Sequence, residues 1–298
     1  MVSPPPRLRV GVIGSGRVGA VLGAALRRTG HQVVACSARS DLSRVRAEAL
    51  LPGVPIAPPR DVAEQCDLVL LTVPDDRLPE VVADLAPVVR SGQIVMHVSG
   101  RLGLDVMAPL VGVLPIAAHP VMTFTGTSLD LERLEDCPFG VTAPDVVRPI
   151  AEALVVEMGG EPVWVEEGSR GLYHAALAHG ANHLVTLVAQ TLDLLSSAGV
   201  SEPAVLARPL LTAALDNALR EGDAALTGPI ARGDVATVRA HLIELEGADE
   251  ATLAAYLTLA RATLDRAVAR GAIDEARAGE IGDLLDAAEA PWEYGGLP

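Results

Sequence analysis

The sequence predicts an α/β domain with a doubly wound, mostly parallel sheet, followed by an all-helical domain. Two observations lead to this prediction. Up to about residue 166, short apolar runs alternate with helical patterns, which is typical of strands buried on both faces and joined by crossover helices. Beyond Gly168 strand patterns vanish and long Ala/Leu-rich segments follow. We therefore expect one domain at residues 1–166 and a second at 167–298.

Apolar runs and helical periodicity place the individual elements along the chain. Strands are expected at 8–14, 31–37, 67–73, 93–99, 111–120, 139–144 and 161–169. Helices of the first domain are expected at 19–30, 77–89 and 145–158. Helices of the second are expected at about 170–198, 203–221, 234–246, 249–270 and 274–289. Helix ends are indicated by Gly30, Gly199, Gly222 and Gly271, and helix starts by Ser201 and Asp234.

Composition narrows the class of protein. Half of the 298 residues are hydrophobic and only 2% are aromatic, so the core must consist of Ala, Val and Leu. A net charge of −15 argues against nucleic acid or an anionic membrane as a partner. Three cysteines without metal or disulfide spacing, and the lack of an apolar leader among the first residues, predict a cytoplasmic protein.

The chain contains no lysine, since all 23 basic residues are arginine. Schiff-base chemistry, a P-loop lysine and a lysine general acid are therefore excluded. Any anionic substrate must be held by arginine or by uncharged donors.

A glycine-rich segment follows the first predicted strand and opens the first predicted helix. It reads Gly14-Ser15-Gly16-Arg17-Val18-Gly19, the G-x-G-x-x-G pattern in the strand–turn–helix context of a Rossmann dinucleotide site. Its glycines permit a tight turn, close approach to a pyrophosphate and close helix–strand packing, and the helix N-terminus favours phosphate. The alternative is a tight turn with nothing bound.

The second strand indicates which dinucleotide is preferred. An NAD site usually has an acidic residue at the end of this strand, but here Ser37, Arg39 and Ser40 stand there. Arginine can pair with a 2′-phosphate and serine can donate to it, so NADPH is expected as the cofactor. The alternative is a solvated basic loop.

Several further motifs carry a resemblance to a known family. They are TVPDD (72–76), HVSG (97–100), AHPVMTF (118–124), YHAALAHGANHL (173–184) and LTGPIARGD (226–234). With the glycine motif, they resemble the Rossmann-like oxidoreductases whose helical C-terminal domain was long of unknown function, relatives of the 6-phosphogluconate dehydrogenase-like superfamily. Some members are PanG-type ketopantoate reductases. The resemblance implies reduction of ketopantoate to pantoate, for coenzyme A synthesis, and contacts from Val73 and Pro74 to the cofactor.

The chain departs from the superfamily at one position of chemical importance. Other ketopantoate reductases and hydroxyacid dehydrogenases carry a lysine on the first helix of the second domain. This chain has none, so another residue or water must supply the proton.

Candidate chemical groups lie at the predicted carboxyl ends of strands, where open parallel sheets bind their ligands. The hydroxyl of Ser99 and the amide of Gly100 are expected to hold a substrate carboxylate, unless they form a simple turn. His119 is a candidate proton donor or carboxylate partner, unless it only caps a buried loop before Pro120.

The helix predicted at 170–198 holds three of the seven histidines within ten positions. His174 is the expected proton donor because histidine can titrate near neutrality, and Asn182 is expected to orient the substrate. His179 and His183 share one helix face, but the segment lacks the glutamate of a zinc H-E-x-x-H motif and has no third ligand nearby. These two are expected to be core residues, and no metal is expected.

The remaining predicted substrate contacts are Arg170, Thr227 and Arg232, with a surface ion pair as the alternative for Arg232. The function expected is NADPH-dependent reduction of a small 2-oxo acid, most simply ketopantoate. The alternatives are an imine reductase of the pyrroline-5-carboxylate reductase type and a non-catalytic NADP(H)-binding regulatory protein. The Ala/Leu-rich helices predict a homodimer.

Overall fold

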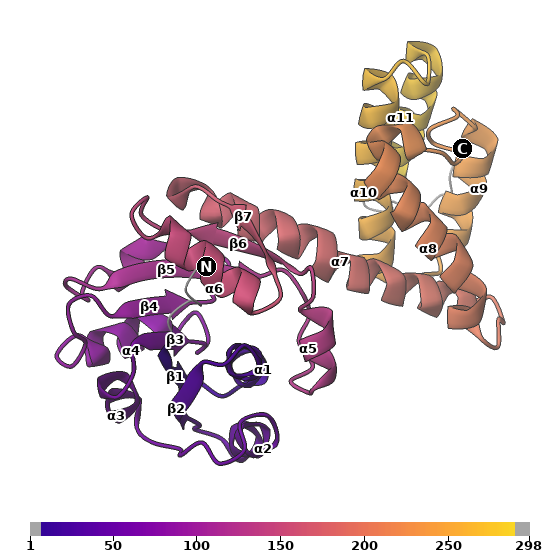
Figure 1. Cartoon of the computed structure of the whole chain (residues 1–298). Helices are drawn as coiled ribbons and strands as arrows, with labels where there is room; N and C mark the ends of the chain where they lie inside the picture. Colours follow the sequence, from indigo (N-terminus) through magenta and orange to yellow (C-terminus); the bar gives the residue numbers. More distant parts are fainter. Residues whose placement is uncertain (1–6, 290–298) are drawn as a thin grey trace, which may run out of the picture. The chain divides into compact units, whose positions relative to one another are not determined.

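The computed structural model describes residues 7–289 and contains two compact units, which divide between Ala181 and Asn182. The first unit is a seven-stranded sheet with helices on both faces (Figure 1). Its strand order is β2-β1-β3-β4-β5-β6-β7. The strands are β1 (Arg9–Ile13), β2 (Gln32–Ser37), β3 (Leu68–Leu71), β4 (Ile94–His97), β5 (Leu114–Pro120), β6 (Pro138–Thr142) and β7 (Glu161–Trp164).

All neighbouring strands pair in parallel except β5 and β6, so β6 and β7 run opposite to the other five strands. This confirms the predicted doubly wound, mostly parallel Rossmann-like fold. The antiparallel register places His119 of β5 directly opposite Gly140 of β6. His119, near the carboxyl end of β5, therefore has a neighbour on β6 that lacks a side chain.

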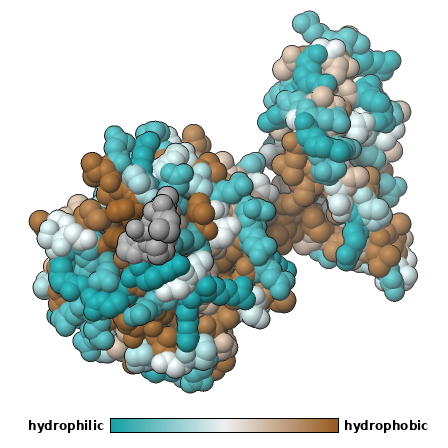
Figure 2. Space-filling model, viewed as in Figure 1, coloured by the Kyte–Doolittle hydropathy of each residue, from teal (hydrophilic) through white to brown (hydrophobic). Residues whose placement is uncertain are grey.

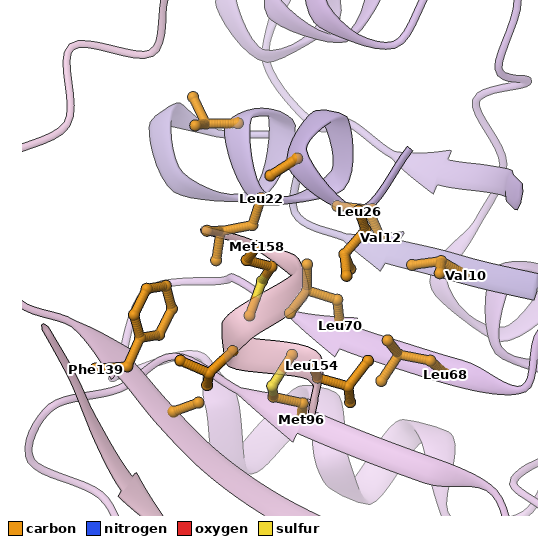
Figure 3. Close-up of a cluster of buried hydrophobic side chains, with 14 of the residues drawn as sticks. Val10, Val12, Leu22, Leu26, Leu68, Leu70, Met96, Phe139, Leu154 and Met158 are labelled. Atoms are coloured by element: carbon orange, nitrogen blue, oxygen red, sulfur yellow. The ribbon is translucent and has the colours of Figure 1, made fainter. Parts of the chain in front are cut away.

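Alternate side chains of the strands build a core on each face. On one face, apolar side chains of β1 and β3 pack against α1 (Arg17–Arg28) and α6 (Arg148–Glu157), as Figure 3 shows for Val12, Leu22, Leu70 and Leu154. On the other, residues such as Val69 pack against α3 (Pro59–Glu64) and α4 (Leu78–Leu85). Burial on both faces explains why the strands are apolar along their length.

The bounds of three short helices of the first unit were not predicted from the sequence: α2 (Asp41–Leu50), α3 and α5 (Leu129–Arg133). In α2 only Ser43 and Ala47 are buried, so the sequence carries no apolar stripe. A capping box at Ser40 begins this helix instead, since its side chain accepts from the Ser43 amide.

The C-terminal half is helical, as predicted. Its helices are α7 (Arg170–Ser197), α8 (Pro203–Glu221), α9 (Val235–Leu245), α10 (Glu250–Ala269) and α11 (Glu275–Glu289). Gly199 and Gly271 follow helix ends with positive φ, and Asp234 caps α9 by accepting from the Thr237 amide. None of the helices described within 7–289 is long and apolar enough to cross a membrane. The two compact units divide inside α7. The domain boundary expected from the sequence, at 166/167, instead marks the change from strands to helices, and it stays a prediction.

The helices of the second unit differ in burial. Helices α9, α10 and α11 share an apolar core that includes Val238, Leu242, Leu264 and Ile281. By contrast, α8 buries only Ala207 among its described residues. Many apolar side chains of α7 and α8 are exposed, and apolar residues gather on part of this unit's surface in Figure 2.

Candidate active site

The glycine motif forms a tight loop between β1 and α1. Gly14 has a φ of +104°, and a Cβ there would lie 2.9 Å from the Thr72 carbonyl oxygen. The Gly14 amide donates to the Ser37 hydroxyl at 3.0 Å, and the Ser15 amide donates to the Ser37 carbonyl at 2.8 Å. A Cβ at Gly19 would overlap the Gly14 carbonyl and the Thr72 hydroxyl, so only glycine allows this helix–strand contact.

The loop offers unsatisfied donors where α1 begins. Gly16 is the N-cap without a side-chain hydrogen bond, the first turn contains no acid, and the position of a Gly16 Cβ is open. The Ser15 hydroxyl is fully buried and has no hydrogen-bond partner among residues 7–289. The Cys36 thiol lies near Ser15, which partly opposes the rise that burial causes in the pKa of the thiol. Sulfur is a weak acceptor, and the Ser15 hydroxyl forms no hydrogen bond of normal geometry with it. A helix N-terminus with an orphaned hydroxyl suits an anion.

A cavity of about 1040 Å³ opens from this loop. Its lining includes eight of the predicted cofactor contacts: Gly14, Ser15, Gly16, Ser37, Arg39, Ser40, Val73 and Pro74. Arg17, Val18 and Gly19 are the first residues of α1 and do not line the cavity. Further lining comes from α3 and α4, including Arg60, Arg77, Glu80 and Asp84.

The end of β2 supplies both structural and ligand-facing groups. Ser37 holds the glycine loop and Ser40 caps α2, so each hydroxyl already has a role within the fold. Arg39 is exposed at the cavity, and no hydrogen bond or ion pair within 7–289 engages it. Arg39, two residues after the end of β2, is therefore a charged side chain that is available to bind a phosphate.

A second polar cluster lies at the ends of β4 and β5. An added Cβ at Gly100 would lie 2.6 Å from His174 Cδ2 and 3.1 Å from His119 Nε2, so the structure brings these three predicted residues together. The two histidine rings stand edge to face with centroids 6.0 Å apart. Ser99 is buried, and its hydroxyl accepts from the Leu102 amide at 3.0 Å, which leaves the hydroxyl proton available for donation.

Tyr173 was not predicted to take part in the site. Its hydroxyl lies 2.9 Å from His119 Nδ1, and its ring stands edge to face with the imidazole. The residue is adjacent in sequence to His174, but only the fold shows that it reaches β5. Asp75 follows the cavity-lining residue Pro74 in the chain, and its negative charge partly opposes the lowering of the His119 pKa.

Burial keeps two histidines of this region neutral. Desolvation, followed by repulsion from His174 and Arg170, lowers the pKa of His119 to about 4. Desolvation also lowers the pKa of His97 to about 4. The amide of Ser99 donates to His97 Nδ1, so the proton of this ring must lie on Nε2, which donates to the Gly103 carbonyl at 3.0 Å.

The prediction that Arg170 binds a substrate carboxylate is wrong, because its guanidinium is buried and occupied. It donates to the carbonyl oxygens of Ser99, Leu102 and Gly140 and to the Thr142 hydroxyl, at 2.5–3.3 Å. Burial lowers its pKa, with Tyr173 and Glu167 opposing the shift. Arg170 therefore ties the start of α7 to the segments after β4 and on β6.

Residues predicted on the rest of α7 are not buried in this chain. His179 and His183 are exposed, so their assignment to the core is wrong for the single chain. Asn182 is also exposed and belongs to the second unit, as do Thr227 and Arg232. Arg232 is exposed, and its guanidinium donates to the Thr227 hydroxyl at 3.4 Å. The substrate roles of these residues stay predictions.

Comparison with protein families identifies both halves of the chain. Residues 2–120 match a Rossmann-like domain, and residues 137–263 match a domain of unknown function, DUF2520. Comparison with curated proteins found no matching sequence.

Solved structures share this two-part architecture. A Bacteroides fragilis protein with the provisional name NADP oxidoreductase is 20% identical, covers 86% of this chain and 98% of its own, and has a TM-score of 0.73. A Thermotoga maritima protein is 21% identical, with 88% and 99% coverage and a TM-score of 0.65. A pyrroline-5-carboxylate reductase from Coxiella burnetii is 14% identical, with 95% and 98% coverage and a TM-score of 0.54. At these identities the likeness shows the fold.

Proposed function

We propose that this protein is an NADPH-dependent oxidoreductase that reduces a small 2-oxo acid, with ketopantoate as the first substrate to test. The observation that carries the proposal is the glycine loop, where a buried Ser15 hydroxyl lacks a partner beside an uncapped helix N-terminus and a large cavity. The backbone of residues 14–19 and the Ser15 hydroxyl would hold the pyrophosphate.

The preference for NADPH rests on the end of β2. Arg39 is exposed after the end of β2, and β2 itself contains no carboxylate. A 2′-phosphate would therefore gain a charge-assisted contact with Arg39 that a 2′-hydroxyl would not. Structural relatives do not decide the matter, since the Bacteroides protein's name includes NADP and a ketol-acid reductoisomerase of similar fold is described as preferring NADH.

The cluster around Gly100 fits carbonyl reduction. The bound cofactor supplies the hydride for the carbonyl carbon, and the carbonyl oxygen must receive a proton. His174, half-buried beside His119, is the proposed proton donor. The Ser99 hydroxyl and the Gly100 amide are the proposed donors to the substrate carboxylate, because Arg170 is fully engaged by protein oxygens.

A second candidate is reduction of a cyclic imine. Pyrroline-5-carboxylate reductases from Coxiella burnetii and Plasmodium falciparum each align with 95% of this chain, and the latter structure has NADP bound. An imine nitrogen needs the same pair of a hydride and a proton, so the cluster would serve either substrate.

The test is an NADPH-oxidation screen with the full chain over 2-oxo acids, including ketopantoate, and cyclic imines, including pyrroline-5-carboxylate. Turnover of a 2-oxo acid is the expected result. Turnover of imines alone would establish the second candidate. NADPH binding without turnover of any compound would contradict both and favour a regulatory binding protein.

We also propose that the protein is a homodimer, with α7 and α8 in the interface. Leu172, Val185, Leu210 and Leu219 on these helices are more than two-thirds exposed. Such a concentration of exposed apolar side chains is typical of a surface that another chain covers.

A further inference from the structure

Tyr173 and His119 form a hydrogen-bonded pair that the proposed chemistry has not yet used. The Tyr173 hydroxyl reaches His119 Nδ1 from the first turn of α7, across to the end of β5. The contact joins two elements that are 54 residues apart in sequence. It therefore fixes the ring that faces Gly100.

The opposite side of the Tyr173 hydroxyl is packed against β6. A side chain at Gly140 would overlap the Tyr173 hydroxyl and ring, so the tyrosine can occupy this position only because residue 140 is glycine. Burial raises the pKa of Tyr173, so the hydroxyl keeps its proton. Among residues 7–289, His119 Nδ1 is the one hydrogen-bond partner of this hydroxyl, so the hydroxyl's single proton is directed to it.

We infer that Tyr173 is a positioning residue that holds His119 as the tautomer with its proton on Nε2, so that this N–H donates to the substrate. The inference rests on the proposed function for the identity of the acceptor, a carbonyl or carboxylate oxygen. The Nε2 atom lies 3.1 Å from the position of a Gly100 Cβ, beside His174.

The tautomer decides whether His119 helps or hinders the reaction. With the proton on Nε2, a neutral imidazole stabilises negative charge that develops on the substrate oxygen. With the proton on Nδ1, Nε2 would present a lone pair to that oxygen and repel it. The lowered pKa of His119 keeps the ring neutral at pH 7, so the choice of tautomer is the remaining variable. His174 then supplies the proton, and His119 stabilises charge.

The first arm of the test needs no substrate. In protein labelled with ¹⁵N in its histidine rings, correlation spectra report which nitrogen of His119 is protonated, with His119→Gln used for assignment. The wild-type protein should show Nε2–H, and Tyr173→Phe should show a mixture of both tautomers. A wild-type ring protonated on Nδ1, or an unchanged spectrum in Tyr173→Phe, would overturn the inference.

The second arm measures turnover of the best substrate from the screen. Tyr173→Phe should lower kcat about five- to tenfold, the loss expected for one neutral hydrogen bond, and leave NADPH affinity unchanged. The matched control is Tyr256→Phe, since Tyr256 contacts His241 Nδ1 at 3.1 Å in the second unit and should not affect kcat. An unchanged kcat in Tyr173→Phe would also overturn the inference. If no substrate is turned over, the proposed function fails, and the spectra still decide the tautomer.

Discussion

Replacement of Arg170 by methionine should strongly destabilise the first unit. The side chain is 1% exposed and makes four hydrogen bonds that connect α7, the segment after β4 and strand β6. Methionine has a similar length but cannot donate, so buried carbonyl oxygens of Ser99 and Leu102 would lose a charged partner.

The structure sets the size of the effect. Each hydrogen bond to a charged group contributes about 1.5–3 kcal/mol, so four of them set a ceiling of about 6–12 kcal/mol. Removing the buried guanidinium also removes its desolvation cost, which is several kcal/mol. The free energy of unfolding should therefore fall by about 3–5 kcal/mol, which is that ceiling less the desolvation cost.

Urea unfolding followed by circular dichroism measures this difference, with Arg232→Met as the matched control. Arg232 is exposed and makes one long hydrogen bond, so its loss should change stability by less than about 0.5 kcal/mol. Arg170→Lys should remain destabilised, because one ammonium group cannot span four acceptors around a planar guanidinium. A loss below about 1 kcal/mol in Arg170→Met would refute the structural role.

Three further outcomes follow from the same structure. Because the folded-state pKa values of His97 and His119 are about 4 and the unfolded value is about 6.5, the unfolded chain binds more protons between these values, and each histidine should lower stability by up to about 3 kcal/mol as the pH falls from 6.5 towards 4. His97→Gln should therefore lose about half of this pH dependence, and a fall equal to that of the wild-type protein would contradict the prediction. His174→Gln should lower kcat about 10²–10⁴-fold with NADPH affinity unchanged, whereas His241→Gln should not; nearly full kcat in His174→Gln would assign the proton to His119 or water. Light scattering should give a dimer for the wild-type chain and a monomer for Leu210→Glu, and a wild-type monomer would exclude the proposed interface.

Local patterns were sufficient to predict most of the fold. Strands β3 and β4 are buried along their whole length, which explains their apolar sequences. The helices after residue 170 were each predicted within a few residues of their bounds. The sequence did not predict that β6 is antiparallel to β5. The direction of a strand depends on the path of the connecting chain, here the segment with α5, and not on the composition of the strand. The bounds of α2 could not be predicted because this helix buries too few apolar residues to give a periodic pattern.

The site was predicted in part, and the reason lies in sequence distance. The glycine loop is a local feature, so its residues could be predicted together. The partners of Arg170 lie about 30 and 70 residues away, and those of Tyr173 lie on β5 and β6, so no local pattern reports them. The uncharged stretch of α7 led to the expectation that His179 and His183 are core residues, but a single chain leaves them exposed.

Titration calorimetry with NADPH and NADH tests the central claim most directly. The wild-type protein should bind NADPH about 10- to 100-fold more tightly than NADH, which is the value of one charge-assisted contact from Arg39 to the 2′-phosphate. Arg39→Asp should reverse the preference, since a carboxylate repels the phosphate and accepts from a 2′-hydroxyl. Equal dissociation constants for the two cofactors in the wild-type protein, or binding of neither, would contradict the account.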